Sequence, residues 1–346
     1  MSLPNAKAAR ADSLWGLVLA AGEGRRLQGY IRRTLGADLP KQFVSFTGDL
    51  SMLEQTYRRA EHLIRPEKIL TIVGKHHLQH DEVKRQLAKR DATTIIVQPR
   101  NRETGPGVLL PLLHLYKRHP GAIVAMFPSD HFILQEKRFM EYVALAVQAV
   151  AHDTAQMVML AMEPHAPEVE YGYILPRLGD GQIALWGTRQ TAGFIEKPNR
   201  QLAQQLVSAG GLWNTMIMVF KVRTLLQMMR QLSPAIYYQF ANIFGTLGTP
   251  AEEKAVEALY ENIEPMNFSS DFLEKVSRVT PTAIAVLPVL GVYWSDWGSP
   301  ARLVRTLEQL EQVNEKKRSS GINLGAASNS NQSIWQTEQF QTARSA

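Results

Sequence analysis

Short runs of apolar residues alternate with stretches of helical periodicity through the first half of the chain. The apolar runs predict buried strands at 15–20, 68–73, 93–97, 122–127 and 156–161. Between them, Ser51 and Glu54 form a capping box that opens a helix. Apolar residues three and four apart predict further helices at 77–89, 108–118 and 139–151. Strands alternating with helices predict a parallel sheet covered on both faces.

The second half of the chain predicts a more antiparallel region and a closing helix. Strands are predicted at 171–178, 191–196, 212–220, 283–287 and 292–294, with Gly179-Asp180-Gly181 as a turn between the first two, and helices around 222–260 and at 301–315. Residues 1–13 are expected to form a loose leader, and the polar residues 316–346 a disordered tail. We therefore predict an α/β fold in which residues 14–315 form a single three-layer domain with a mostly parallel, mixed central sheet.

Composition limits the chemistry. The chain has 346 residues and no cysteine, which excludes disulfides, thiol nucleophiles, zinc ribbons and iron–sulfur clusters. Any metal must bind carboxylate oxygen or imidazole, which favours Mg²⁺-type chemistry. The apolar runs are shorter than the ~20 residues that cross a bilayer, so no membrane partner is expected. Lys7 and Arg10 precede an apolar run, but Asp12 interrupts the pattern of a signal peptide, so we expect a cytoplasmic protein.

The formal net charge is +6, from 38 Lys and Arg against 32 Asp and Glu. Such an excess suits a nucleic acid, a membrane surface or a phosphorylated small molecule. The basic residues gather in predicted loops, with Arg25, Arg26, Arg32, Arg33 and Lys41 in one and Arg100 and Arg102 in another. Clusters in loops favour a small phosphate ligand. Because the chain shows no recognisable nucleic-acid module, no nucleic-acid partner is expected.

The segment after the first predicted strand contains Gly22, Gly24 and Arg26. Ligands of open α/β sheets bind at the carboxyl ends of strands, where small residues let backbone N–H groups approach a phosphate. Leu27 stands where a dinucleotide fingerprint has its third glycine, and the sequence of a Walker loop is absent. The alternative is a plain glycine turn with solvated arginines. Lys41, in the same predicted loop, is either a phosphate ligand or a solvated lysine.

Two aspartates each follow a predicted strand. Asp130 comes after the strand 122–127, and Asp296 after the strand 292–294. A carboxylate at such a position can hold a divalent cation that bridges phosphates. The alternative for Asp130 is that it caps the next helix. Two such aspartates can clamp one Mg²⁺ if the fold brings them together, which sequence spacing does not show.

Two further strands carry polar residues near their ends. Glu196 and Lys197 close the strand 191–196, and Asn214 lies near the start of 212–220. Glu and Asn side chains can exchange hydrogen bonds with sugar hydroxyls, and the lysine can counter phosphate charge. The alternative is a strand-end ion pair and an Asn turn.

Three histidines, His76, His77 and His80, stand at the start of the predicted helix 77–89. His76 and His80 are four positions apart, a spacing that places two imidazoles on one helix face. The glutamate of the zinc-protease motif is missing, so we interpret all three as the solvated start of a helix.

Taken in order, these segments resemble the sugar-phosphate nucleotidylyltransferases, most closely the mannose-1-phosphate guanylyltransferases. The resemblance extends from about residue 14 to residue 310 and rests on five ordered blocks, at 19–27 with 40–43, 127–131, 194–198, 213–214 and 294–299. Segments 171–174 and 270–275 also look like family segments. It implies the Rossmann-like fold of the nucleotide-diphospho-sugar transferases.

The resemblance also implies roles for individual positions. It assigns nucleotide binding to Ala20, Ala21, Gly22, Gly24, Arg26, Arg102, Thr104, Ser129 and Asp130. It assigns sugar binding to Gly172, Glu196, Lys197 and Asn214. Catalytic roles fall to Arg26, Lys41 and Asp130, and Mg²⁺ binding to Asp130 and Asp296.

The implied reaction joins GTP and mannose 1-phosphate to give GDP-mannose and pyrophosphate. A sugar-phosphate oxygen attacks the α-phosphorus in line, so positioning and charge neutralisation carry the catalysis. The expected partners are GTP and a sugar 1-phosphate, with a homodimer as an open possibility.

The chain departs from the family pattern at several positions. Arg25 stands where Ser or Thr is usual, the segment 27–40 is longer than typical, and Thr215-Met216 replaces the usual Ser-Gly after Asn214. A glycine there gives room beside the sugar, so Met216 is expected to narrow that pocket. Two alternatives therefore stay open. One is the same chemistry with another pair of substrates, such as glucose 1-phosphate with UTP or dTTP, and the other is a catalytically silent nucleotide-sugar-binding subunit.

Overall fold

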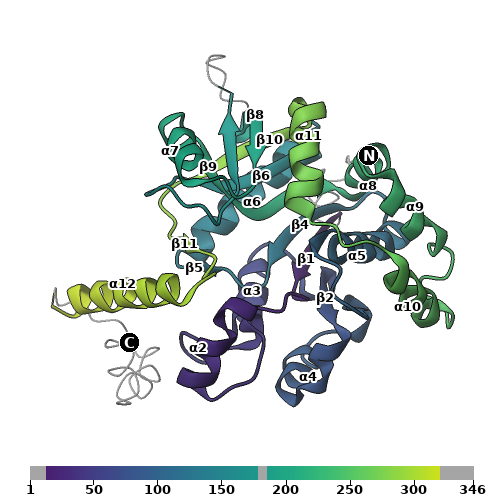
Figure 1. The fold of residues 1–346 in the computed structure, drawn as a ribbon, viewed down its shortest axis with the longest axis horizontal. Coiled ribbons are helices and arrows are strands. Elements are labelled where there is room, and N and C mark those ends of the chain that lie inside the picture. Colours follow the sequence, from purple (N-terminus) through teal and green to yellow (C-terminus); the bar gives the residue numbers. More distant parts are fainter. Residues whose placement is uncertain (1–12, 178–184, 320–346) are drawn as a thin grey trace, which may run out of the picture.

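A nine-stranded sheet runs through the centre of the protein in the order β3-β2-β1-β4-β9-β6-β10-β8-β7 (Figure 1). The computed structural model describes residues 13–177 and 185–319. The strands of this sheet are β1 (Leu14–Leu19), β2 (Ile69–Gly74), β3 (Ile95–Gln98), β4 (Ile123–Pro128), β6 (Met157–Met162), β7 (Tyr173–Pro176), β8 (Arg189–Ile195), β9 (Leu212–Lys221) and β10 (Ile284–Val289). A separate two-stranded ribbon joins β5 (Phe132–Ile133) and β11 (Trp294–Ser295).

Strand direction confirms the mostly parallel, mixed sheet. Strands β3, β2, β1 and β4 pair in parallel, and so do β6 and β10. Strand β9 lies antiparallel between β4 and β6, and β8 is antiparallel to β10 and β7. Within the described residues, β8 and β9 are therefore the two strands of the nine that run against the rest. The reversed β9 joins the two parallel groups into one sheet.

Helices cover both faces of the sheet, which gives the predicted three layers. The longer helices are α2 (Arg25–Leu35), α3 (Met52–Ala60), α4 (Asp81–Leu87), α5 (Thr104–Arg118), α6 (Glu136–Ala151), α7 (Arg200–Ser208), α8 (Val222–Leu232), α9 (Pro234–Asn242), α10 (Glu252–Asn262), α11 (Glu274–Val279) and α12 (Pro300–Ser319). Strand β1 sends Trp15 and Leu17 to the core under α5, α8, α9 and α10, and Leu14 and Val18 to the core under α3, α4, α6 and α7. This alternation follows from the two-residue period of a strand.

Several local predictions are confirmed, and others change. Ser51 and Glu54 form the predicted capping box of α3, in which the backbone N of Glu54 donates to Ser51 Oγ and the backbone N of Ser51 donates to Glu54 Oε2. Helix α5 begins at Thr104 rather than at 108, and α12 continues to Ser319 rather than ending at 315. The predicted helix 77–89 is divided into a 3₁₀ turn, η3 (Lys75–Gln79), and α4. The predicted turn Gly179-Asp180-Gly181, most of the predicted leader and the tail from residue 320 lie outside the described residues.

The prediction of an arginine-rich loop after β1 is wrong, because residues 25–35 form helix α2. Leu27, Tyr30 and Ile31 are its buried residues, and they pack with Trp297 and the first turns of α12 in a third apolar cluster. The arginines lie on the opposite, polar side. No helix within 13–177 and 185–319 has both the length and the apolar character needed to span a membrane.

Candidate active site

The loop between β1 and α2 forms a cradle at the carboxyl end of β1. The side-chain amide of Gln42 donates hydrogen bonds to the carbonyls of Ala20 (2.9 Å) and Gly22 (2.7 Å), which fixes the path of the loop. Gly24 has a φ of +60°, and a Cβ there would lie 2.9 Å from the backbone N of Lys41. Only glycine fits this combination of left-handed backbone and close approach. The loop can therefore lie directly against the 3₁₀ turn η1 (Lys41–Phe43).

Lys41 is buried, with 4% of its surface exposed. Its ammonium lies 2.8 Å from Asp130 Oδ2 and donates to the carbonyls of Asp296 (2.5 Å) and Trp297 (3.3 Å). The sequence left a solvated lysine as an alternative, and burial excludes it. This one ammonium contacts the carboxylate of Asp130 and the backbone carbonyl of Asp296, the two residues of the predicted cation site.

The charge of Asp130 is set by its neighbours. Burial opposes ionisation of the carboxyl, but the Lys41 ammonium and His131 outweigh this effect, and the pKa of Asp130 lies below its usual range. The carboxylate is therefore ionised at neutral pH. Asp130 does not cap the next helix, because α6 begins at Glu136.

Asp296 is held by three donors on one oxygen. Its Oδ1 accepts hydrogen bonds from Tyr171 Oη (2.9 Å), Arg302 Nη1 (2.6 Å) and the backbone N of Gly298 (3.0 Å). Its Oδ2 accepts no hydrogen bond from the residues that the structure describes. A Cβ at Gly298 would lie 2.4 Å from this Oδ2 and 3.1 Å from Arg26 Nη2, so glycine keeps the space between the carboxylate and the arginine open.

The ribbon β5–β11 brings the two aspartates together. Ser295 pairs with Phe132 and Trp294 with Ile133, so Asp296 leaves one strand where Asp130 enters the other. The Trp294 indole also donates to His131 Nδ1 (3.2 Å). The sequence predicted a strand at 292–294, but neither β5 nor this pairing.

A pocket of about 380 Å³ lies beside this arrangement. Eleven of the fifteen predicted site residues line it, namely Ala21, Gly22, Gly24, Arg26, Lys41, Thr104, Ser129, Asp130, Glu196, Lys197 and Asp296. An adjoining hollow along α2 includes Glu23 and Arg25. Ala20, Arg102, Gly172 and Asn214 are outside the lining of the pocket.

Arg102, predicted to contact the nucleotide, binds backbone carbonyls in the structure. Its guanidinium donates to the carbonyls of Tyr260 (2.8 Å) and Glu261 (3.0 Å) near the end of α10. Gly105, at the start of α5, donates to the carbonyl of Met266 (2.8 Å), and a Cβ there would lie 2.9 Å from the same oxygen. Arg102 and Gly105 thus dock the N-terminus of α5 at the pocket.

The far side of the pocket holds Glu196, Lys197 and Met216. Burial raises the pKa of Glu196, and nearby Glu274 adds to this while Lys197 opposes it. Gly172 lies behind Glu196, and a Cβ at Gly172 would come within 2.5 Å of Glu196 Oε2. Asn214 is also behind the wall, where its Oδ1 accepts from the backbone N of Met216 (2.9 Å). Both residues support the pocket wall from behind.

Sequence reasoning missed several lining residues. Gln98, Asn101, Glu103, Asn267 and Ser269 all face the pocket. Glu103 has a φ of +67° and precedes α5, and its backbone N donates to Asn101 Oδ1 (2.9 Å). Such strained backbone is concentrated at functional sites, but it has no signature in a single sequence.

We expect His131 to make the free energy of unfolding depend on pH. Burial lowers the pKa of His131 to about 4, from 6.5 in the unfolded chain. Between these values the unfolded chain takes up a proton that the native protein does not. The contribution of His131 to the free energy of unfolding is therefore fully present above pH 6.5 and is lost as the pH falls towards 4. We expect a loss of about 1.4 kcal/mol per pH unit in this range. Urea unfolding at several pH values should show it.

His131→Asn is the control, because Asn keeps an acceptor for the Trp294 indole. The free energy of unfolding of the variant should lack this part of the acid slope. Equal slopes in the two proteins would contradict the assignment to His131.

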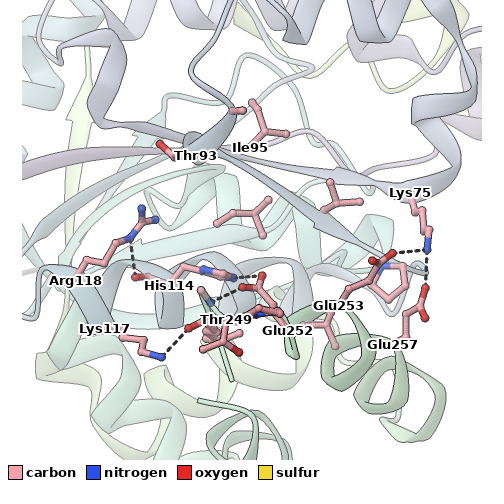
Figure 2. Close-up of a pocket in the computed structure, with 18 of the residues that line it drawn as sticks. Lys75, Thr93, Ile95, His114, Lys117, Arg118, Thr249, Glu252, Glu253 and Glu257 are labelled. Atoms are coloured by element: carbon pink, nitrogen blue, oxygen red, sulfur yellow. Dashed lines mark hydrogen bonds and ion pairs between the residues drawn. The ribbon is translucent and has the colours of Figure 1, made fainter. Parts of the chain in front are cut away.

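A larger pocket, of about 680 Å³, lies against the edge strand β3 (Figure 2). Lys75 there pairs with Glu253 (3.1 Å) and Glu257 (2.6 Å), and His114 lies 3.1 Å from Glu252. None of the predicted site residues lines it. Size alone therefore does not identify the functional pocket.

Known proteins match both the sequence and the fold. The sequence model of the family described as nucleotidyl transferase matches residues 15–313. The xanthan biosynthesis protein XanB of Xanthomonas campestris is 28% identical over 306 residues, which cover 86% of this chain and 60% of XanB. A mannose-1-phosphate guanylyltransferase of Escherichia coli is 25% identical over 300 residues, which cover 82% of this chain and 59% of that protein. The chain thus spans about 60% of the length of these curated relatives.

Solved structures support the fold. The crystal structure of a mannose-1-phosphate geranyltransferase from Thermus thermophilus matches with a TM-score of 0.67 at 23% identity, over 83% of this chain and 76% of that one. A mannose-6-phosphate isomerase from Helicobacter pylori matches with a TM-score of 0.61 at 18% identity, over 82% of this chain and 99% of that one. The family match covers most of the chain, and the described fold agrees with it. The chain is a member of the nucleotidyl transferase family.

Proposed function

We propose that this chain transfers the guanylyl group of GTP to mannose 1-phosphate, releasing pyrophosphate and GDP-mannose. The observation that carries the proposal is a glycine-lined pocket that includes both Asp130 and Asp296, where the buried ammonium of Lys41 contacts the carboxylate of Asp130 and the backbone carbonyl of Asp296. The choice of substrates is supported by the relatives named as mannose-1-phosphate guanylyltransferases.

Each group has a role in an in-line transfer. The backbone of the cradle at Gly22 and Gly24 receives the triphosphate, and Arg26 at the pocket wall adds a cationic donor. Lys41 orients Asp130 and neutralises charge on the transferring phosphate. The sugar 1-phosphate enters from the side of Glu196 and Lys197, and its phosphate oxygen attacks the α-phosphorus. Such a transfer needs no covalent protein intermediate, because positioning and charge stabilisation supply the rate.

The two carboxylates fit a divalent cation such as Mg²⁺. Asp130 is ionised, and Asp296 keeps Oδ2 without a hydrogen bond among the described residues, whereas its Oδ1 is saturated. Hard cations of this kind prefer carboxylate oxygen and retain several waters. When bound, the cation would neutralise phosphate charge at the reacting centre. Tyr171 and Arg302 keep Asp296 in place for this purpose.

Pyrophosphate release tests the proposal. Full-length protein should be assayed with a matrix of nucleoside triphosphates and sugar 1-phosphates, with Mg²⁺ and with a chelator. Turnover confined to GTP with mannose 1-phosphate, and abolished by the chelator, is the expected result. Turnover with another pair would keep the chemistry and change the substrates. Folded protein without turnover on any pair would overturn the proposal and favour a silent binding subunit.

Met216 supports a second candidate function, in which the acceptor of the nucleotidyl group is a sugar 1-phosphate related to mannose 1-phosphate. Met216 lines the pocket with a φ of +56°, and its sulfur accepts a hydrogen bond from Ser269 Oγ (3.1 Å). The left-handed backbone explains why glycine is usual at this position of the family. The thioether fills space that a glycine would leave open to the sugar.

Met216→Gly is expected to relax acceptor selection. The ratio of kcat/KM for mannose 1-phosphate to that for glucose 1-phosphate should move about tenfold towards one, which is the size of effect that small changes in pocket volume have on selection. Met216→Ala is the matched control, because it opens the pocket but keeps a Cβ on left-handed backbone. Both variants should change selection, and the Gly variant should be about 1 kcal/mol more stable than the Ala variant. Unchanged selection in both would show that the side chain does not reach the acceptor.

A further inference from the structure

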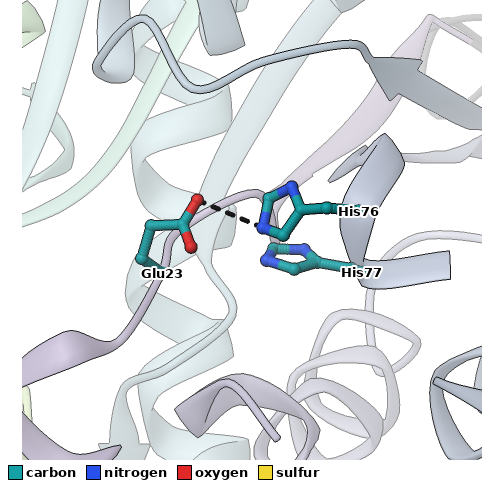
Figure 3. Close-up of side chains that lie close together, drawn as sticks. All are labelled: Glu23, His76 and His77. Atoms are coloured by element: carbon teal, nitrogen blue, oxygen red, sulfur yellow. Dashed lines mark ion pairs between the residues drawn. The ribbon is translucent and has the colours of Figure 1, made fainter. Parts of the chain in front are cut away.

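Three side chains that can bind a metal converge behind the cradle (Figure 3). Glu23 belongs to the loop between β1 and α2, and His76 and His77 belong to the turn η3 after β2. One ligand atom from each residue lies within 4.8 Å of the others. The interpretation of His76, His77 and His80 as the solvated start of a helix is wrong for His77, because its side chain is completely buried. The structure instead groups His76 with its neighbour His77 and with a residue more than fifty positions away.

One histidine of this cluster has an unsatisfied nitrogen. His77 is completely buried, and its Nε2 has no hydrogen-bond partner among the described residues. Its Nδ1 accepts a long hydrogen bond (3.4 Å) from the backbone N of Gly74. The Nε2 of His76 is also buried, and it lies 3.2 Å from Glu23 Oε1 in an ion pair (Figure 3) whose geometry does not meet that of a hydrogen bond. Buried polar atoms are normally paired, so the unpartnered Nε2 of His77 points to a missing ligand.

Access and charge state suit a metal ion. The His76 side chain is 41% exposed and that of Glu23 is 25% exposed, so solvent reaches the cluster. Burial, with added repulsion from His76 and His80, lowers the pKa of His77 to about 3, so its imidazole is neutral at pH 7. Neutral imidazole and carboxylate together favour Zn²⁺, Co²⁺ or Ni²⁺ over Mg²⁺, which prefers oxygen alone.

We propose that Glu23, His76 and His77 form a site for one transition-metal ion of the Zn²⁺ type. Three protein ligands leave the fourth tetrahedral position to water. To bind through Nε2, the His77 imidazole moves its proton from Nε2 to Nδ1 and gives up the long bond from Gly74. No net proton is released in this step.

None of its three ligands belongs to the pair Asp130 and Asp296, although Glu23 and Asp130 line the same hollow along α2. Its position gives it a structural consequence, because Glu23 lies between Gly22 and Gly24, which line the main pocket. A bound ion would connect the cradle loop to the end of β2. It would thus restrict the loop without entering the reaction, and its binding does not depend on the proposed substrates.

Cobalt binding to untagged, full-length protein tests the proposal. With excess Mg²⁺ present to fill the site at Asp130 and Asp296, Co²⁺ should bind with a stoichiometry of one, with visible d–d absorption, and Zn²⁺ should displace it. Zn²⁺ should also raise the midpoint of thermal unfolding by a few degrees, since it binds the native state. These readouts are independent of enzyme activity.

Variants of the exposed ligands identify the site. His76→Gln and Glu23→Gln should each weaken Co²⁺ binding about 100-fold or more, whereas His80→Gln and Asp130→Asn should leave it unchanged. His76 and Glu23 are preferred because both side chains are partly exposed, and circular dichroism should confirm that the variants fold. No cobalt signal in the wild type would overturn the proposal, and so would wild-type affinity for Co²⁺ in His76→Gln and Glu23→Gln. Loss of binding in His80→Gln would do so as well.

Discussion

Asp130→Asn is expected to lower kcat for nucleotidyl transfer by about 10²-fold or more, the size of effect seen when one preorganised electrostatic contact is removed. The carboxylate is held ionised next to Lys41 at the edge of the pocket. Asparagine preserves the shape but removes the negative charge that a divalent cation requires. Steady-state pyrophosphate release at saturating nucleotide and Mg²⁺ measures the effect.

A surface carboxylate provides the control for Asp130. Asp38 pairs with Arg32 (2.8 Å) in an exposed ion pair away from the pocket lining. Asp38→Asn should keep wild-type turnover, since exposed pairs contribute little. Unimpaired Mg²⁺-dependent turnover of Asp130→Asn would remove the assignment of Asp130 to the reacting centre.

Lys41→Met should have the second large effect, on both activity and stability. Activity should fall about 10²–10³-fold, because the ammonium is the group placed between Asp130 and the carbonyls of Asp296 and Trp297. The free energy of unfolding should fall by about 1–3 kcal/mol, because buried acceptors lose their donor. Urea unfolding and pyrophosphate release measure the two effects separately.

The double variant Lys41→Met/Asp130→Asn distinguishes the two contributions. Removing the Asp130 charge should restore part of the stability lost in Lys41→Met, since directly contacting residues couple by about 0.5–3 kcal/mol. It should restore no activity. Strict additivity of the two stability changes would show that the ion pair does not contribute to folding.

Much of the fold follows from local sequence pattern. The buried strands β1, β2, β4 and β6 lie within one or two residues of their predicted ranges, because short continuous apolar runs are typical of strands buried on both faces. Helix α2 was missed although Leu27, Tyr30 and Ile31 have helical spacing. Its glycine N-cap offers no side-chain signal, and the charged residues suggested a loop. The order of strands was also unpredictable, because β9 inserts between β4 and β6 from far along the chain.

The candidate site likewise has residues that the sequence could predict and residues that it could not. Residues at the ends of strands, such as Asp130 and Glu196, were recognisable because a strand end in an open α/β sheet is where ligands bind. The lining residues Asn267 and Ser269 belong to a segment that reaches the pocket only because Met266 pairs with Gly105 across the fold. Nothing in their local sequence indicates this.

The sequence by itself determined the buried strands, the aspartates that follow two of them, and the glycines of the cradle, since each depends on neighbours a few positions away. Only the tertiary structure decided that Asp130 and Asp296 line one pocket beside Lys41, and that Glu23 lies close to His76 and His77. The contact between Trp294 and His131, 163 positions apart, illustrates why. Such pairings are selected by the packing of the whole core, whose energy is distributed over many residues and has no local signature.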